Sequence, residues 1–253
     1  MAADLRIRIY EDSRAAVSAP EVAAFLRSRV PRAEVTVRQE FFAFHKAPPA
    51  TSGAVAALRV KRPDRPPEGA PLPPEVLHEE RVLRGEARPL GLLYDGFRFA
   101  ELCRDLLPRE EAGLGDLHLL LTPRLLGTLE EDGRYHARVV ILSVPCLLSV
   151  PGLRTAPAMP REFYFLRRSP ATASAPEEML LEQFKGRYLE EEQFTEAAKG
   201  YALQAAFYWR FGEAFCEDRR CRLFNAHWQE EVLEAQIGSG RLCERHRGML
   251  EEI

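Results

Sequence analysis

Residues 216–246 read CEDRRCRLFNAHWQEEVLEAQIGSGRLCERH and contain three of the five cysteines of the chain. Cys216 and Cys221 form the pattern C-x4-C, Cys243 lies further along the chain, and His246 follows it as C-x2-H. Zinc prefers four thiolate or imidazole ligands in a tetrahedron, which two such short-range pairs can supply. The spacing therefore predicts one zinc ion held by these four residues. The alternative is a set of buried free thiols.

The predicted zinc is structural, because four protein ligands leave no coordination position for water or substrate. Arg219, Arg220 and Arg222 beside it are a feature that nucleic-acid-binding zinc modules share. Acidic residues close by in the sequence offset this positive charge: Glu217, Asp218, Glu230, Glu231 and Glu234. A nucleic-acid-binding module therefore remains an alternative that the local charge disfavours.

The segment before Cys216 carries a family resemblance. Residues 205–223 read AAFYWRFGEAFCEDRRCRL. This resembles the motif of archaemetzincins, a branch of the metzincin zinc peptidases: H-E-x-x-H-x-x-G-x-x-H-C-x4-C-x-M, with C-x2-C about twenty residues later. The register matches without a gap. Gly212 falls on the glycine that bends the chain after the active-site helix, and Leu223 stands where the family has its Met-turn methionine.

The cysteines also match this motif, but the catalytic residues do not. Ala205 stands at the first histidine ligand, Ala206 at the general-base glutamate, Trp209 at the second ligand and Phe215 at the third. Hydrolysis at a metal needs an activated water and a base beside it, and none of these side chains can provide either. The resemblance therefore implies a zinc-binding protein without peptidase activity, with a closed, apolar version of the cleft. His246 replaces the fourth family cysteine.

An active hydrolase with a different site is the alternative. His227 and Glu230 are spaced H-x-x-E, which on a helix places both side chains on one side. A third ligand would have to be His118, His136 or an acidic residue. The sequence places none of these near the pair. His118 lies in an apolar run and is expected to be a buried core residue.

The first part of the chain alternates strand and helix patterns. Residues 5–10, LRIRIY, alternate apolar and charged side chains, which is typical of a half-buried strand. Residues 20–29 are predicted to form a helix and residues 34–38 a second strand. Strand, helix and strand in this order indicate an α/β fold.

Apolar patterns predict further helices and strands in the rest of the chain. Residues 94–107 predict a helix, and the apolar runs 116–122 and 137–143 predict two strands. Residues 176–215 predict a long helical segment with a break near Thr195, whose hydroxyl can cap a second helix. The order resembles that of archaemetzincins, in which two such strands pair and an edge strand binds peptide. We therefore expect an α/β, zincin-like mixed sheet with packed helices and a C-terminal structural zinc knuckle.

Four parts are expected along the chain. Residues 1–45 form the N-terminal strand, helix and strand of the main domain. Residues 46–76 are rich in proline, which blocks helix and sheet hydrogen bonds, and are expected to be a loop. Residues 77–215 complete the α/β core, and residues 216–253 form the zinc-binding subdomain.

Composition sets the remaining expectations. The chain has 253 residues and a formal net charge of -3, so no general basic field indicates nucleic acid. Its apolar runs are too short for a membrane span, and its first residues lack the pattern of a signal peptide. A cytoplasmic protein is therefore expected, with Cys103 and Cys146 as packed thiols. The predicted role is a binding or scaffolding module that captures a peptide or protein partner by strand addition.

Overall fold

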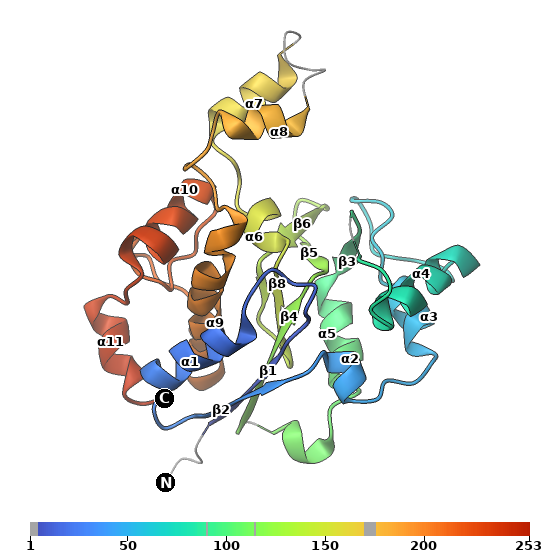
Figure 1. The fold of residues 1–253 in the computed structure, drawn as a ribbon, viewed down its shortest axis with the longest axis horizontal. Helices are drawn as coiled ribbons and strands as arrows, with labels where there is room; N and C mark the ends of the chain where they lie inside the picture. Colours follow the sequence, from blue (N-terminus) through green and yellow to red (C-terminus); the bar gives the residue numbers. More distant parts are fainter. Residues whose placement is uncertain (1–4, 90, 114, 170–175) are drawn as a thin grey trace.

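The computed structural model describes residues 5–89, 91–113, 115–169 and 176–253 (Figure 1). Within them a five-stranded main sheet has the order β2-β1-β4-β8-β7, and a second sheet has the order β3-β5-β6. The main strands are β1 (Arg6–Tyr10), β2 (Glu34–Arg38), β4 (Asp116–Thr122), β7 (Val140–Ile141) and β8 (Cys146–Ser149). The others are β3 (Leu93–Asp95), β5 (Leu125–Leu129) and β6 (Tyr135–Arg138).

Helices cover both faces of the main sheet. The α-helices are α1 (Ala19–Arg29), α2 (Phe41–Phe44), α3 (Thr51–Ala56), α4 (Pro73–Leu83), α5 (Gly96–Arg104), α6 (Gly152–Thr155), α7 (Arg161–Arg168), α8 (Glu177–Glu182), α9 (Phe194–Phe211), α10 (Gln229–Val232) and α11 (Glu244–Leu250). Two 3-10 helices and a π-helix complete the set: η1 (Arg109–Glu111), η2 (Glu191–Gln193) and η3 (Leu233–Ser239).

Figure 1 shows how these helices are distributed. α1 and α9 lie on one side of the sheet with α10 and α11 beyond them, and α2 to α5 lie on the other side. α7 and α8 project from the body, where Phe163 and Phe184 pack in a small cluster of their own. The four strands β2, β1, β4 and β8 run parallel, and β7 is antiparallel to β8. The predicted mixed α/β fold with packed helices is confirmed.

Side-chain alternation explains the two faces of this sheet. Ile7 and Ile9 of β1 are fully buried in the core that α1 and α9 share, together with Leu117 and Leu119 of β4. The residues between them face the opposite side, because successive strand side chains alternate. Tyr10 belongs to the second core, under α5. The pattern LRIRIY therefore places an apolar row on one face and a mixed row on the other.

α9 is the most deeply buried helix of the C-terminal half. Most of its residues from Phe194 to Phe207 are buried. Many are alanine or glycine, so that the sheet, α1 and η3 approach its backbone closely. A Cβ atom on Gly200 would lie 1.7 Å from Oε1 of Gln236 in η3. The wide small-residue face that the sequence showed is therefore a core surface, as predicted.

The prediction for residues 137–143 is wrong. A single strand paired with residues 116–122 was expected, but β6 and β7 divide this segment between the two sheets. β4 pairs instead with β1 and with β8. β8 lies inside the sheet, between β4 and β7, and Cys146, Leu147 and Leu148 are apolar on both faces, as strands covered on both sides are.

Two other expectations need correction. The proline-rich segment 46–76 contains α3 and the first turn of α4, and its remaining loop is tied down by backbone hydrogen bonds from Val60 to Leu93 and from Tyr135 to Pro63. The helical segment 176–215 does break before α9, but Thr195 does not cap it. The cap residue is Gln193, and the Thr195 hydroxyl accepts a hydrogen bond from Ser18 N at 3.0 Å.

A buried ionic cluster joins α4 to the second sheet. Glu79 is fully buried and accepts hydrogen bonds from Arg59 at 2.6 Å, from Arg124 at 2.8 Å and from the Tyr94 hydroxyl at 2.6 Å. Arg124 is only 1% exposed. Buried ionic groups of this kind are stable only when each keeps its charged or hydrogen-bonding partner.

We predict that Glu79→Ala lowers the free energy of unfolding by about 3–5 kcal/mol, because two buried guanidinium groups lose their counter-charge. Denaturant unfolding monitored by circular dichroism measures this. Glu80→Ala is the matched control on the same helix. Its ion pair with Arg84 is long, at 3.8 Å, and lies at the surface, so a loss of about 0.5 kcal/mol or less is expected. Equal losses for both variants would contradict the structural role of the cluster.

Candidate metal centre

Four metal-binding side chains converge in the C-terminal segment. The ligand atoms of Cys216, Cys221, Cys243 and His246, here called the Cys3His cluster, all lie within 4.8 Å of one another. Sγ of Cys216 is 3.9 Å from Sγ of Cys243, and Nδ1 of His246 is 3.7 Å from Sγ of Cys221 and 3.0 Å from Sγ of Cys243. The sequence placed these same residues at one site.

The geometry of the Cys3His cluster fits zinc. With Zn–S bonds of ~2.3 Å and Zn–N bonds of ~2.0 Å, a tetrahedral ion requires S···S distances of ~3.8 Å and S···N distances of ~3.6 Å. The distances from Cys216 to Cys243 and from Cys221 to His246 match these values, and the Cys243–His246 distance is shorter. Three thiolates and an imidazole are also the ligand chemistry that zinc prefers. The cluster can therefore hold a metal ion.

Backbone hydrogen bonds bring the ligands together. Cys216 N donates to the carbonyl oxygen of Leu223, and Arg222 N donates to that of Arg241, each at 2.7 Å. The second of these bonds joins the segment after Cys221 to the segment before Cys243. Backbone N–H groups also donate to two of the sulfur atoms: Asp218 N to Cys216 and Cys243 N to Cys221, each at 3.4 Å. Such contacts favour the thiolate form that a metal requires.

The Cys3His cluster packs directly against α9. The His246 ring meets the Phe207 ring edge-on, with 5.5 Å between ring centroids. α9 ends at Gly212, which adopts a left-handed conformation (φ 72°) and donates its N–H to Tyr208 O. Only glycine adopts this conformation without strain, and the reversal starts the chain toward Cys216. The structure therefore places Gly212 at the bend that the motif predicts.

The four degenerate motif positions lie around the same helix. Ala205 and Ala206 are fully buried in the main core, and Trp209 is half-buried against it. Phe215 differs, because it is 46% exposed and lines a small cavity of about 100 Å³ with Gln204. The expectation of a closed apolar cleft is therefore wrong for this residue.

A family model matches almost the whole chain. The family described as "Probable metallopeptidase family (DUF6775)" matches residues 3–253. The chain belongs to this family. Comparison with curated proteins finds no match. Among solved structures, the chain is similar to the archaemetzincin of Methanopyrus kandleri, at 10% sequence identity and a TM-score of 0.49, over 99% of this chain and 96% of that one. None of the described helices is long and apolar enough to cross a bilayer.

Family membership confirms the resemblance to metallopeptidases. A metallopeptidase would need residues that bind a catalytic metal. Over the described residues, the Cys3His cluster is the one group of three or more His, Cys, Asp or Glu side chains whose ligand atoms converge. The alternative pair, His227 and Glu230, is not formed. His227 precedes α10 rather than lying on it, and Glu230 is paired with Arg187 at 2.7 Å. The expected placement of both on one side of a helix is therefore wrong.

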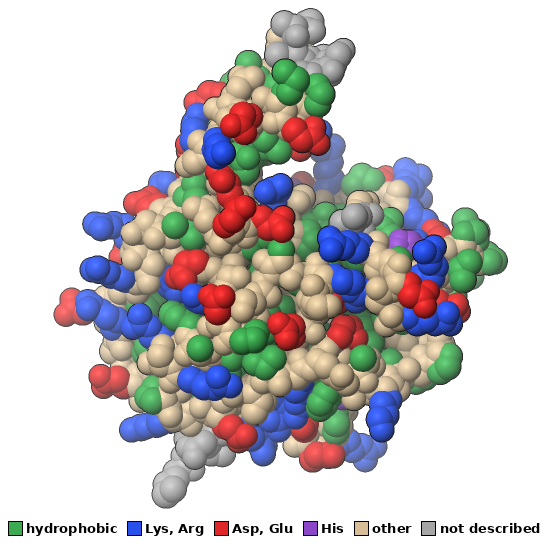
Figure 2. Space-filling view, viewed as in Figure 1, with side chains coloured by type: hydrophobic (Ala, Val, Ile, Leu, Met, Phe, Trp, Pro, Cys, Tyr) green, Lys and Arg blue, Asp and Glu red, His purple; other side chains and the backbone are tan. Residues whose placement is uncertain are grey.

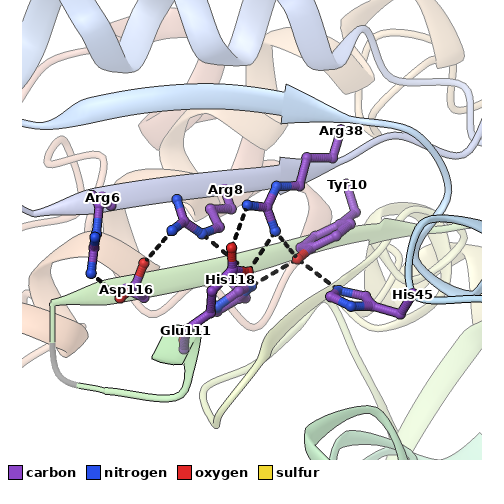
Figure 3. A network of polar contacts seen from close by, with 8 residues as sticks. All are labelled: Arg6, Arg8, Tyr10, Arg38, His45, Glu111, Asp116 and His118. Carbon is purple, nitrogen blue, oxygen red and sulfur yellow. Dashed lines mark hydrogen bonds and ion pairs between the residues drawn. The ribbon is translucent and has the colours of Figure 1, made fainter. Parts of the chain in front are cut away.

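The other alternative ligands are engaged elsewhere. His136 pairs with Asp132 at 2.9 Å on the surface. His118 is fully buried in β4, within a polar network that crosses β2, β1 and β4 (Figure 3). This confirms it as a core histidine. The arginines beside the cysteines are also engaged, since Arg219 pairs with Glu231 and Arg222 with Glu196.

The hydrogen-bond directions in the network of Figure 3 follow from its partners. Nε2 of His118 lies 2.8 Å from the carbonyl oxygen of Glu111, which can only accept, so Nε2 carries the hydrogen. Nδ1 of the neutral ring then accepts from the Tyr10 hydroxyl at 2.9 Å. The Tyr10 oxygen in turn accepts from Arg38 and from Nε2 of His45, each at 2.9 Å. The accepting Nδ1 makes His118 neutral, and the low pKa of His45 favours a neutral ring there too.

Burial and neighbouring charges favour the neutral form of His118 and His45. Desolvation, with the positive charge of Arg38, lowers the pKa of His45 to about 4, and desolvation lowers the pKa of His118 as well. Glu111 keeps its charge here, because its hydrogen bond with Arg38 lowers its pKa to about 2. The network thus holds two carboxylates, Glu111 and Asp116, and two neutral imidazole rings on and beside three strands.

We predict that Cys216→Ser lowers both the zinc content and the melting temperature, because structural zinc binding and folding are linked. Elemental analysis and differential scanning calorimetry measure the two effects. Cys103→Ala, at a buried cysteine outside the cluster, is the control and is expected to keep the wild-type zinc content. Cys216→Ser with unchanged metal and stability would show that the cluster binds no structural ion.

We also predict an acid-sensitive fold. A histidine whose folded pKa lies below its unfolded value of 6.5 stabilises the protein fully above pH 6.5, and this contribution is lost as the pH falls toward about 4. The free energy of unfolding, measured by urea from about pH 7 to about pH 4.5, is expected to fall more steeply for wild type than for His45→Gln. Identical slopes for wild type and His45→Gln would contradict the assignment.

Proposed function

We propose that this member of the metallopeptidase family is a zinc-binding protein without peptidase activity, which acts as a binding or scaffolding module. The observation that carries the proposal is the burial of Ala205 and Ala206 within the main core. A peptidase of the resembled motif needs a histidine and a glutamate there, facing a water-filled cleft. Two methyl groups in a dry core supply neither a ligand nor a base.

We propose further that the Cys3His cluster holds one zinc ion, with a structural role. The cluster contributes four protein ligands, so no position remains for an activated water. When bound, the ion would join the loop after α9 to α11 and hold both against Phe207. The free cysteines and the absence of disulfides among the described residues fit a reducing compartment such as the cytoplasm.

The binding surface that we propose is the segment formed by β6 and β7. Each strand lies at the edge of its sheet, so this segment offers unpaired backbone groups to an added strand. Residues 137–140 also line the cavity that contains Phe215, whose exposed ring can receive an apolar side chain. Strand addition with a side-chain pocket is an established mode of peptide capture.

Metal analysis and peptidase assays test the first part of this proposal. Purified protein is expected to contain about one zinc per chain and to release no product from a mixed library of fluorogenic peptides. A chain with two zinc ions, or peptide hydrolysis that a chelator abolishes while the protein remains folded, would refute it.

The second part needs a separate readout. We predict that peptides selected from a displayed library bind wild type, and that Val140→Pro in β7 weakens binding about tenfold or more by removing an N–H at the edge. Glu34→Ala in β2, at the opposite edge of the main sheet, is the control and is expected to retain binding. Peptides that bind both variants equally would exclude the β6–β7 surface.

A further inference from the structure

A larger cavity lies where α1, α9 and the C-terminal segment meet. Its volume is about 400 Å³, and four arginines line it: Arg29, Arg222, Arg241 and Arg247. Phe25 and three leucines supply an apolar wall, and no acidic residue is among the lining side chains. Several basic side chains are visible in Figure 2 over the positions that α1 and α11 occupy in Figure 1.

Most of this positive charge has no counter-charge among the described residues. In the described part of the chain, no side-chain hydrogen bond or ion pair is found for Arg29, Arg241 or Arg247. Arg29 contacts only an aromatic ring, with its Cζ atom 5.6 Å from the centroid of Phe25. The Cζ atom of Arg222 lies 4.9 Å from the same centroid. Two guanidinium groups therefore share one ring at the cavity wall.

Arg222 is the buried member of the set. Its residue is 2% exposed, and both of its side-chain hydrogen bonds leave from Nη2, one to Glu196 and one to the carbonyl oxygen of Gln236. Nε is also buried and has no acceptor among the described residues. Glu196 is shared, because Lys199 binds it at 2.7 Å. The guanidinium therefore keeps unused donor capacity in a poorly solvated position.

The surroundings of Arg222 are unfavourable for a cation. It is 2% exposed, and the guanidinium of Arg29 lies against the same Phe25 ring. A buried cation with incomplete compensation is costly, and a bound anion would relieve that cost.

Three of the arginines lie next to or close to residues of the Cys3His cluster in the sequence. Arg222 follows Cys221, Arg247 follows His246, and Arg241 lies two residues before Cys243. The backbone hydrogen bond from Arg222 N to Arg241 O joins two of them directly. Arg29 comes from α1, at the other end of the sequence. The fold thus brings the four charges together around one cavity, as a preformed binding site requires.

We propose that this cavity binds a small organic phosphate: an anion with one or more phosphate groups and an apolar or aromatic portion. Phosphate oxygens accept charge-assisted, often bidentate hydrogen bonds from guanidinium groups, and several arginines can share one phosphate. The apolar wall suits the remainder of such a molecule. The volume lies within the range of small-molecule sites and is too small for a folded nucleic acid.

Isothermal titration calorimetry tests this inference on the full-length, zinc-loaded protein at about 50 mM salt, where screening is modest. Three probes separate the possible ligands: inorganic pyrophosphate for the phosphate group alone, ATP for a phosphate with an aromatic portion, and succinate for a carboxylate anion. Pyrophosphate is expected to bind, ATP to bind more tightly, and succinate to bind about tenfold more weakly or not at all.

Charge reversal locates the site. Arg247→Glu is expected to weaken pyrophosphate binding about tenfold or more, because it replaces a donor with a repelling charge. Arg220→Glu is the matched control, since it makes the same charge change one residue from a cysteine ligand but does not line the cavity. Arg29→Glu on α1 is the second test variant, distant in sequence from the cysteines. Zinc content and melting temperature without ligand establish that each variant is folded.

The outcomes are distinct. Weakened binding in Arg247→Glu or Arg29→Glu, with wild-type affinity in Arg220→Glu, supports the site. Absence of pyrophosphate and ATP binding to wild type, equal losses in the control, or succinate affinity equal to that of pyrophosphate would overturn it. None of these results depends on whether the protein hydrolyses or captures peptides.

Discussion

Close packing around α9 is the constraint on which the rest of the structure depends. The helix must pass between the main sheet, α1 and η3, and its small residues leave room for all three. Gly200 shows how strict this is, because even a methyl group would overlap the side chain of Gln236. Ala205 and Ala206 lie on the same crowded helix, fully buried. Their methyl groups carry no atom that can bind a metal ion or accept a proton.

Sequence patterns predicted the elements whose signals are local. β1, β2 and β4 match the expected strands closely, and α1 matches its expected helix, because alternation and a proline at the helix start are properties of short segments. The predictions that failed concern features that depend on contacts between residues distant in the sequence. Residues 137–143 carry one apolar run, but the boundary between two sheets divides it. Cys146 to Leu148 looked like packing residues, and only the neighbouring strands show that they form a central strand. Thr195 had the chemistry of a cap, but a long-range contact with Ser18 uses its hydroxyl.

The two candidate sites also differ in whether local sequence patterns could predict them. The Cys3His cluster was predictable because its ligands form two short-range pairs, so spacing alone indicates a tetrahedral ion. The arginine cavity was not, because Arg29 is far in sequence from Arg222 and Arg247, and arginines are ordinary surface residues. The signal is that Arg29, Arg241 and Arg247 have no carboxylate partner among the described residues, and only the folded arrangement shows this. In the sequence, Arg222 was only one of three arginines beside the cysteines that could indicate nucleic-acid binding, whereas the structure shows it to be 2% exposed.

The pairing of β1 with β4 has a consequence for how the chain folds. These strands are neighbours in the main sheet, yet Arg6 lies opposite Asp116, 110 residues away. The entropy of closing so long a loop must be offset before any contact between the two strands stabilises the chain. Proteins dominated by such distant contacts reach the native state slowly, and their apolar strands stay exposed meanwhile. The alternating arginines of β1 then have a second effect, since charge along an unpaired strand opposes its association with other chains.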